Sequence, residues 1–225
     1  MSLTKIKLNN VIFDLDGTLV DSSFDVLRIL IDSINKNGGN LCSNTKIKIG
    51  PPLIDMITSV VPEFSEEKKY KIQEDFRIAY SADDLKNTIP FDGIIELLNR
   101  LKENNIDVFI VTYKPKSLAM KILNRHFNNL YLDVLTPTEI EDFSKGKTKV
   151  DILNLLMSKW KILHEESVMV GDAQNDITCA KQLGISTIGA LYGYGEVSEF
   201  EMADKKVNSV EELSKYLNNL IREIK

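Results

Sequence analysis

Short runs of apolar and β-branched residues alternate along most of this chain with longer segments whose apolar residues recur every three or four positions. The short runs cover residues 11–13, 108–111, 134–135, 168–170 and 185–188. The longer segments have the spacing of helices that pack one face on a core. Strand and helix in alternation predict an α/β fold, namely a Rossmann-like parallel sheet core flanked by helices. Sheets of this kind bind their ligands at the carboxyl ends of their strands.

One segment interrupts the alternation. After Asp21, the chain to about Thr88 contains no convincing strand, and its apolar spacing indicates several helices, among them 24–35 and 66–80. The strand–helix pattern resumes afterwards. We therefore expect a small α-helical cap domain at residues 20–87, inserted directly after the first strand into a core made of residues 1–19 and 88–225.

The amino-acid composition of the chain excludes several classes of protein. The chain has 225 residues, 43% of them hydrophobic, and a formal net charge of -5. It can bury a core but lacks the basic character usual in nucleic-acid-binding proteins. Its two cysteines, Cys42 and Cys179, lie far apart, which argues against a zinc site or a disulfide framework. No apolar run approaches the ~18 residues of a membrane span. We expect a cytoplasmic protein, a monomer or weak homodimer, that binds neither nucleic acid nor membrane.

Two carboxylates stand at the end of the first expected strand, in the stretch VIFDLDGTLVDS at residues 11–22. Asp14 and Asp16 are two positions apart, so on an extended strand their side chains point the same way. Turn chemistry alone could explain an isolated Asp-Gly pair. However, two like charges held together are costly unless a cation or a proton transfer uses them. Gly17 then allows the backbone to turn sharply and bring amides close to an anion.

A second acidic pair follows the expected strand at 168–170. In VMVGDAQND, Asp172 comes directly after the strand and Asp176 four residues later. Both strands of a parallel sheet end on the same edge, so these acids should meet the first pair. Magnesium suits such a site because it takes one or two carboxylates and keeps water or phosphate oxygens as its other ligands.

These motifs resemble the haloacid dehalogenase (HAD) superfamily of hydrolases. Within it they are similar to the phosphatase branch with a helical cap after the first motif, the branch of the phosphoglycolate phosphatases. Asp14-Leu15-Asp16-Gly17-Thr18 is the most specific motif, and Gly171-Asp172 with Asp176 strengthens it. Thr112, in IVTYKP, matches a shorter motif. The resemblance covers nearly the whole chain.

The resemblance implies a Mg²⁺-dependent phosphatase that hydrolyses a small phosphorylated metabolite through an aspartyl phosphate. Asp14 would attack phosphorus. Asp16 would protonate the leaving oxygen and then take a proton from water. Asp172 would bind the metal directly and Asp176 through water, and Asp14 and the main-chain carbonyl of Asp16 would complete the site. Thr112 would donate a hydrogen bond to a phosphoryl oxygen.

A lysine near the phosphoryl group is also implied, and here the sequence departs from the family pattern. Relatives often show Lys-Pro-x-Pro before a helix, whereas SKGKTKVDIL offers Lys145, Lys147 and Lys149 without a proline. Alignment of the following Asp-Ile-Leu favours Lys147, with the other two left open. An anionic phosphoryl site needs a nearby cation, although all three could instead be solvent-facing.

Substrate contacts are expected from Gly17, Thr18 and Tyr113. The stretch LYGYG, residues 191–195, resembles a WGYG-like stretch of phosphoglycolate phosphatases and is expected near the site. Two other functions stay open. A phosphomutase of the β-phosphoglucomutase type would share both aspartates and the cap. A catalytically silent binding protein could also use this fold, but the intact acidic motifs argue against it.

Overall fold

The structure, a computed structural model, describes residues 8–139 and 148–222. The chain divides into two compact units. One is formed by Met1–Asp21 and Pro90–Lys225, and the other by Ser22–Ile89. The boundaries expected from the sequence, after residue 19 and before residue 88, each differ from these by two residues.

The first unit is built on a six-stranded sheet in the order β5-β4-β1-β6-β7-β8, with every neighbouring pair parallel. The strands are β1 (Asn10–Phe13), β4 (Asp107–Val111), β5 (Asp133–Leu135), β6 (Ser167–Gly171), β7 (Ser186–Ala190) and β8 (Lys205–Val207). The predicted Rossmann-like parallel sheet is therefore confirmed. The edge strand β8 was not predicted, because Lys205 and Lys206 leave it a single apolar residue.

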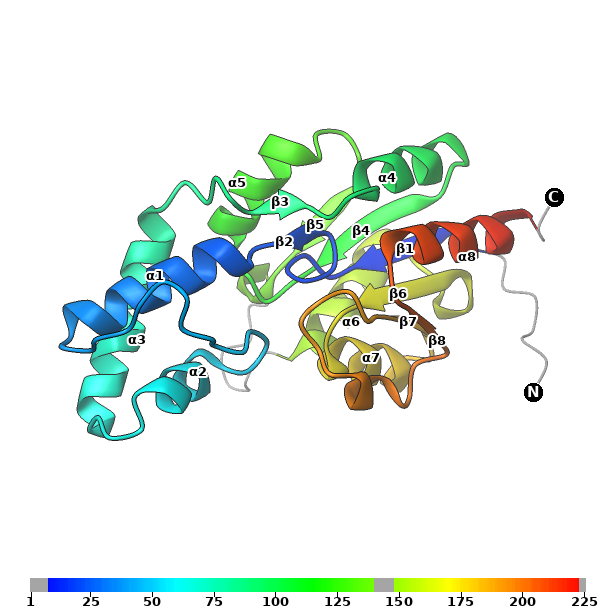
Figure 1. The fold of residues 1–225 in the computed structure, drawn as a ribbon. Coiled ribbons are helices and arrows are strands. Elements are labelled where there is room, and N and C mark those ends of the chain that lie inside the picture. Colours follow the sequence, from blue (N-terminus) through cyan, green and yellow to red (C-terminus); the bar gives the residue numbers. More distant parts are fainter. Residues whose placement is uncertain (1–7, 140–147, 223–225) are drawn as a thin grey trace. The chain divides into compact units, whose positions relative to one another are not determined.

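The register of the central strands determines where the site can form. Phe13, the last residue of β1, pairs with Ile110 of β4 on one side and Val170 of β6 on the other. The carboxyl ends of three adjacent strands consequently lie together at one edge of the sheet (Figure 1). This edge is where parallel sheets place their ligands.

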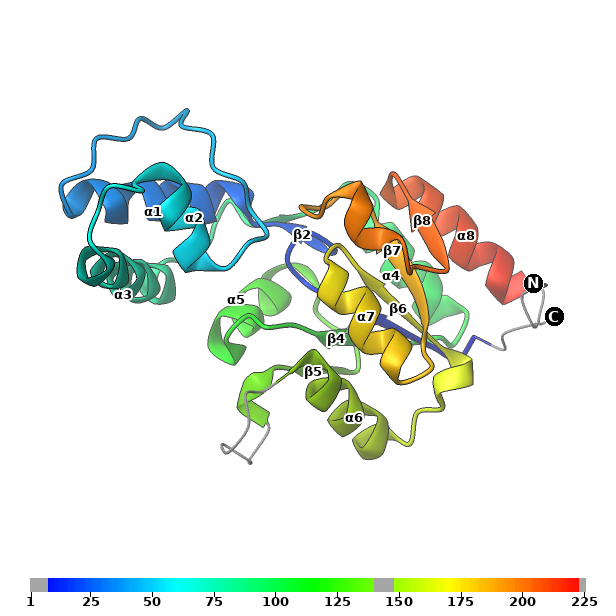
Figure 2. The same cartoon turned by 90° about the horizontal axis from the view of Figure 1, so that it is seen from below.

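Helices cover both faces of the sheet (Figures 1 and 2). On one face, Ile12, Phe109 and Met169 pack in a buried cluster with residues of α6 (Lys149–Trp160) and α7 (Gln174–Gln182). The opposite face carries α4 (Ile94–Glu103) and α8 (Val210–Arg222), which are joined by a hydrogen bond from Arg100 to Ser214 of 3.1 Å. Burial of each large apolar side chain contributes about 1.5–3 kcal/mol, and this anchors the strand ends.

The remaining elements of the first unit are short or peripheral. Helix α5 (Lys116–His126) connects β4 to β5, and three 3₁₀ turns lie at η1 (Pro137–Glu139), η2 (His164–Glu166) and η3 (Val197–Phe200). The strands β2 (Val20–Asp21) and β3 (Ile89–Pro90) pair where the chain leaves this unit and returns to it. Within the described part of the chain, no helix is long and apolar enough to cross a membrane.

The second unit contains the helices α1 (Ser23–Lys36), α2 (Leu53–Val60) and α3 (Glu66–Ala82). Helix α3 packs against both α1 and α2. Its start is capped by the Ser65 hydroxyl, which accepts a bond from the Lys68 N–H, and Glu66 and Glu67 favour the positive end of the helix dipole. The amphipathic spacing of this segment predicted its helices.

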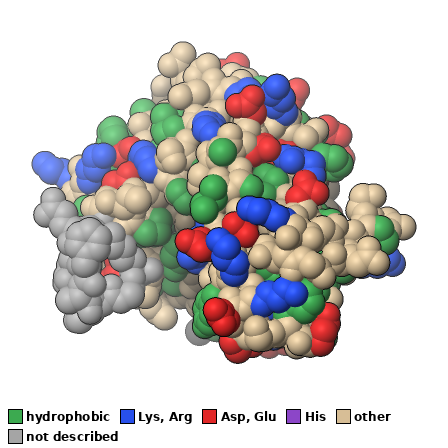
Figure 3. All heavy atoms as spheres, turned by 90° about the vertical axis from the view of Figure 1, so that its left-hand side faces the viewer, with side chains coloured by type: hydrophobic (Ala, Val, Ile, Leu, Met, Phe, Trp, Pro, Cys, Tyr) green, Lys and Arg blue, Asp and Glu red, His purple; other side chains and the backbone are tan. Residues whose placement is uncertain are grey.

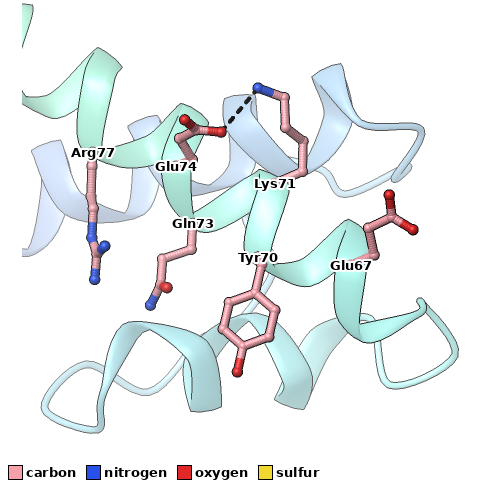
Figure 4. A pocket seen from close by; sticks show the side chains of 6 residues that line it. All are labelled: Glu67, Tyr70, Lys71, Gln73, Glu74 and Arg77. Atoms are coloured by element: carbon pink, nitrogen blue, oxygen red, sulfur yellow. Dashed lines mark hydrogen bonds and ion pairs between the residues drawn. The ribbon is translucent and has the colours of Figure 1, made fainter.

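A groove of about 560 Å³ runs along α3 of this unit. Tyr70, Gln73 and Arg77 point to one side of the helix, and Lys71 and Glu74 form an ion pair on the other (Figure 4). Acidic and basic side chains are also interspersed on the face of the molecule seen in Figure 3. None of the predicted site residues that the structure describes lines the groove.

Candidate active site

Three predicted site residues directly follow the three central strands. Asp14 comes after β1, Thr112 after β4 and Asp172 after β6. All three are buried, with exposed fractions of 7%, 2% and 4%. The main-chain N–H of Asp14 donates to the carbonyl of Val170, which ties the end of β1 to β6. The parallel register thus brings residues 60 to 158 positions apart in the sequence to one edge, as the sequence predicted.

A cluster of three carboxylates forms at this edge. Oxygens of Asp14, Asp172 and Asp176 lie within 4.8 Å of one another, and all three residues are buried. Among the described residues, the side chain of Asp16 is not part of this cluster, and its expected metal contact is through its main-chain carbonyl. Three converging hard oxygen donors are the ligand set that suits Mg²⁺.

One ammonium group lies among these acids. The Nζ of Lys149 is 2.6 Å from Asp14 Oδ1 and also donates to Asp176. Burial would lower the pKa of Lys149, but the two carboxylates outweigh it and raise that pKa above its usual range. The lysine is therefore charged, and it neutralises one of three potential negative charges.

The pKa values of two of these carboxyl groups are raised. Burial raises the pKa of Asp14 well above its usual range, with Asp176 and Asp172 adding to the effect and Lys149 opposing it. Burial likewise raises the pKa of Asp172 to about 7, against a hydrogen bond from the Tyr194 N–H. The cluster holds more negative charge than its lysine neutralises, and a divalent cation would supply what is missing. The residues present thus fit a magnesium ion.

Lys149 therefore lies where the sequence predicted a lysine, whereas the favoured Lys147 and the alternative Lys145 are outside the described residues. The local reason is helix capping. The Thr148 hydroxyl accepts a bond from the Asp151 N–H, and Asp151 accepts one from the Thr148 N–H. This capping box starts α6 at Lys149. The Thr-x-x-Asp spacing was the signal that could have selected this lysine.

Asp16 has a different partner. Lys114 Nζ lies 2.8 Å from Asp16 Oδ1 and 3.0 Å from Oδ2. The side chain of Lys114 is 4% exposed and that of Asp16 26%. The two predicted acids of the first motif thus have separate lysines. Lys114 is not among the residues predicted from the sequence, although its place two residues after Thr112 could have suggested it.

Both the backbone conformation at position 17 and the lack of space for a side chain there require a glycine. Its φ is +77°, in the left-handed region that favours glycine. A Cβ at this position would lie 2.0 Å from Asp172 Oδ2. The next residue, Thr18, is fully buried, and its hydroxyl donates to Asp172 Oδ1 at 3.3 Å. Both were predicted to contact substrate, and in the structure both contact Asp172.

The 191–195 loop, predicted to lie near the site, packs against Asp172. The Tyr194 N–H donates to Asp172 Oδ2 at 2.8 Å, and the Tyr192 hydroxyl donates to the Thr18 carbonyl at 3.0 Å. A Cβ on Gly193 would lie 2.3 Å from Asp172 Cβ. The loop therefore fixes this carboxylate, a function that its glycine and aromatic composition did not reveal.

Tyr113 and Thr112 belong to the loop after β4. The Tyr113 hydroxyl accepts bonds from the Lys149 N–H at 2.8 Å and from Asn175 Nδ2 at 3.1 Å. The Thr112 hydroxyl accepts one from the Lys114 N–H at 3.2 Å. Tyr113 thus holds the start of α6, which carries Lys149. Its expected contact with substrate stays a prediction.

Known proteins resemble this chain in sequence. The sequence model of the haloacid dehalogenase-like hydrolase family matches residues 11–190. A phosphoglycolate phosphatase from Vibrio vulnificus (strain CMCP6) is 30% identical over 204 residues, which are 85% of this chain and 87% of that protein. A 5'-nucleotidase from Pseudomonas aeruginosa is 27% identical over 201 residues, covering 86% of this chain and 87% of that protein.

Solved structures resemble it in fold. The crystal structure of a predicted phosphatase from Clostridium acetobutylicum superposes with a TM-score of 0.78 at 28% identity, over 94% of this chain and 99% of that one. The match of the family along 11–190 includes the three strand ends that carry Asp14, Thr112 and Asp172. Together with the relative at 30% identity, it shows that this chain belongs to the haloacid dehalogenase-like hydrolase family.

Proposed function

We propose that this protein is a magnesium-dependent phosphatase that hydrolyses a small phosphomonoester through an aspartyl phosphate on Asp14. The observation that carries the proposal is the buried arrangement of Asp14, Asp172 and Asp176 around Lys149. Buried carboxylates without full charge compensation are uncommon, because burying an unpaired charge is costly. A site with a lysine and room for a cation suits a carboxylate nucleophile that attacks an anionic phosphoryl group.

Each residue of this chain has a role in the proposed reaction. A carboxylate oxygen of Asp14 attacks phosphorus, and Asp16 gives a proton to the departing alcohol oxygen. Lys149 offsets negative charge between the nucleophile and the phosphoryl group, and Thr112 donates a hydrogen bond to a phosphoryl oxygen. Water then releases phosphate and gives its proton to Asp16.

Asp14 and Asp172, with the main-chain carbonyl of Asp16, would hold the magnesium ion, and Asp176 would reach it through water. When bound, the ion supplies positive charge that reduces repulsion between two anions. The excess of buried carboxylates over lysine at this site supports its presence.

The experiment is a phosphate-release screen of the full-length protein with Mg²⁺. The panel contains phosphoglycolate, sugar phosphates, nucleoside monophosphates and pyrophosphate, since relatives named phosphoglycolate phosphatase and 5'-nucleotidase support small phosphoesters as a class. A chelator should abolish release. Isomerised sugar phosphate without free phosphate would favour a phosphomutase instead.

Two variants locate the nucleophile. Asp14→Asn should abolish turnover and the phosphorylated enzyme while the protein stays folded. Asp133→Asn is the matched control, because Asp133 is a strand residue that bonds Lys159 and Trp160 away from the acid cluster. Rapid-quench mass spectrometry should place the phosphoryl group on Asp14. Full activity of the Asp14 variant, or an adduct on another residue, contradicts the proposal.

A further inference from the structure

A buried lysine contacts the acid that the proposed reaction uses for proton transfer. Lys114 Nζ lies within hydrogen-bond distance of both carboxylate oxygens of Asp16, at 2.8 Å and 3.0 Å. The lysine side chain is 4% exposed, so its long stem is ordered by the protein around it. Burying an ammonium group is costly unless it is paired, and Asp16 supplies a partner.

A hydrogen bond within the loop after β4 holds the main chain of Lys114. Its main-chain N–H donates to the Thr112 hydroxyl at 3.2 Å, directly after β4. Strand β4 pairs in register with β1, which leads into Asp16. The lysine and the acid are therefore carried by two adjacent strand ends, and their contact does not depend on a flexible surface side chain.

This pair is separate from the carboxylate cluster. Lys149 contacts Asp14 and Asp176, whereas Lys114 contacts Asp16. The nucleophile and the proton donor of the proposed reaction thus have different counter-ions. A cation on both oxygens restricts rotation of the Asp16 carboxyl group and stabilises the carboxylate that remains after proton donation.

We propose that Lys114 is a positioning residue that holds Asp16 for proton transfer; this inference rests on the proposed phosphatase function. In the first step Asp14 forms a bond to phosphorus, the bond from phosphorus to the alcohol oxygen breaks, and the Asp16 proton moves to that oxygen. In the second, water attacks phosphorus, its proton returns to Asp16, and the bond to Asp14 breaks to release phosphate. Lys114 contacts Asp16 throughout and does not touch phosphorus.

Leaving-group dependence separates this role from a merely structural one. A good leaving group needs little protonation, and a poor one needs much. Lys114→Met should therefore slow release from an alkyl phosphate such as phosphoglycolate by a factor of about 10² or more, the usual range for lost proton transfer. Phosphorylation of Asp14 by 4-nitrophenyl phosphate, measured by rapid quench, should change by less than about tenfold. KM should change little.

Lys116→Met is the matched control. Lys116 is two residues away and pairs with Glu139 at 2.9 Å instead of a site residue. This variant should keep the wild-type ratio between the two substrates. Lys114→Arg, which retains a cation able to contact both oxygens, should recover part of the ratio. An equal loss on both substrates in Lys114→Met would overturn the proposal.

A double-variant cycle tests whether Lys114 acts through Asp16. In an Asp16→Asn background, Lys114→Met should cost no further activity, because the group it holds is gone. Independent, multiplying losses would overturn the proposal and point to a direct phosphate contact. Circular dichroism and thermal unfolding identify misfolded protein. If Lys114→Met does not fold, Lys114→Gln, which keeps the length and polarity but not the charge, replaces it in both tests.

The outcomes for the two proposals differ. If the wild-type protein with Mg²⁺ releases phosphate from neither ester, the phosphatase function is wrong, and the role of Lys114 falls with it. If the wild type releases phosphate and Lys114→Met matches it on both substrates, only the role of Lys114 is wrong.

Discussion

At the scale of single residues, Lys149 is the counter-ion of the buried acids. It donates to Asp14 at 2.6 Å and to Asp176, and its side chain is 4% exposed. The family motif does not choose among Lys145, Lys147 and Lys149, because they have the same charge and stand at alternate positions of one short stretch of sequence. The structure places Lys149 at the site because α6 begins there, so that its side chain projects from a capped helix start.

Removing this charge should impair the reaction more than the fold. We expect Lys149→Met to lower kcat by about 10² to 10³, the range seen when one charge-stabilising donor is lost from an active site. The control is Lys159→Met on the same helix, because Lys159 pairs with Asp133 and is half exposed. Steady-state kinetics check the result. Wild-type kcat in the Lys149 variant would contradict the role given to it.

At the scale of elements, the 191–195 loop and the Gly17 turn hold Asp172 from two sides. Sequence patterning predicted the strands that deliver the acids, because their short apolar runs are uninterrupted and alternate with helical segments. It could not predict contacts such as the Tyr194 N–H to Asp172, since main-chain donors leave no signature in side-chain pattern. The edge strand β8 was not predicted because two of its three residues are lysines.

The loop gives a prediction about metal affinity. Gly193→Ala would place a Cβ 2.3 Å from both Asp172 Cβ and the Gly17 carbonyl oxygen. Asp172 or the Gly17 turn would have to move, and overpacking of this kind costs about 1–3 kcal/mol. We expect weaker Mg²⁺ binding by calorimetry and a lower Tm. Tyr192→Phe, which loses one hydrogen bond without adding volume, should bind Mg²⁺ like the wild type. Unchanged affinity in Gly193→Ala would contradict the tight packing.

The helical unit offers a second test at this scale. Asp25, in the first turn of α1, is fully buried and accepts bonds from the Asn87 N–H, Asn87 Nδ2 and the Thr88 hydroxyl at 2.9–3.0 Å. It joins the start of this unit to its end. Asp25→Ala should lower the free energy of unfolding of the unit by about 2–4 kcal/mol, because several buried donors lose a charged acceptor.

Amide hydrogen exchange of the whole chain shows, residue by residue, where the Asp25 variant loses stability. Exchange should accelerate in α1 and in residues 87–88, while the strands of the sheet unit keep their protection. Asp32→Ala, at an exposed position of α1, is the control and should change stability by no more than about 0.5 kcal/mol. Unaltered exchange in the Asp25 variant would mean that these bonds contribute nothing.

At the scale of the whole molecule, three carboxyl groups lie close together in one buried cluster, with one lysine among them. The formal net charge is -5, and burial raises the pKa values of Asp14 and Asp172 in this cluster. The carboxyl groups of Glu139 and Asp75 behave oppositely, each with a pKa of about 2. Those two groups are ionised in folded and unfolded protein above about pH 5, so their stabilising contribution is complete there and does not change with pH.

Stability of the metal-free protein should therefore fall as pH rises from about 5 to about 7. The pKa of Asp172 is about 7 in the folded protein against 3.8 ordinarily, so in this window the folded state binds more protons than the unfolded chain. The carboxylate cost is absent below about pH 4 and complete above about pH 7. Mg²⁺ should reverse the trend, since it binds the ionised carboxylates and must displace protons at low pH. Thermal unfolding with chelator and with Mg²⁺ measures both effects, and Asp172→Asn should flatten the two curves relative to the wild type. A metal-free Tm that rises across this range would contradict the raised pKa of the buried carboxyl groups. A shift by Mg²⁺ that is larger at pH 5 than at pH 8 would show that the acid cluster is not where the cation binds.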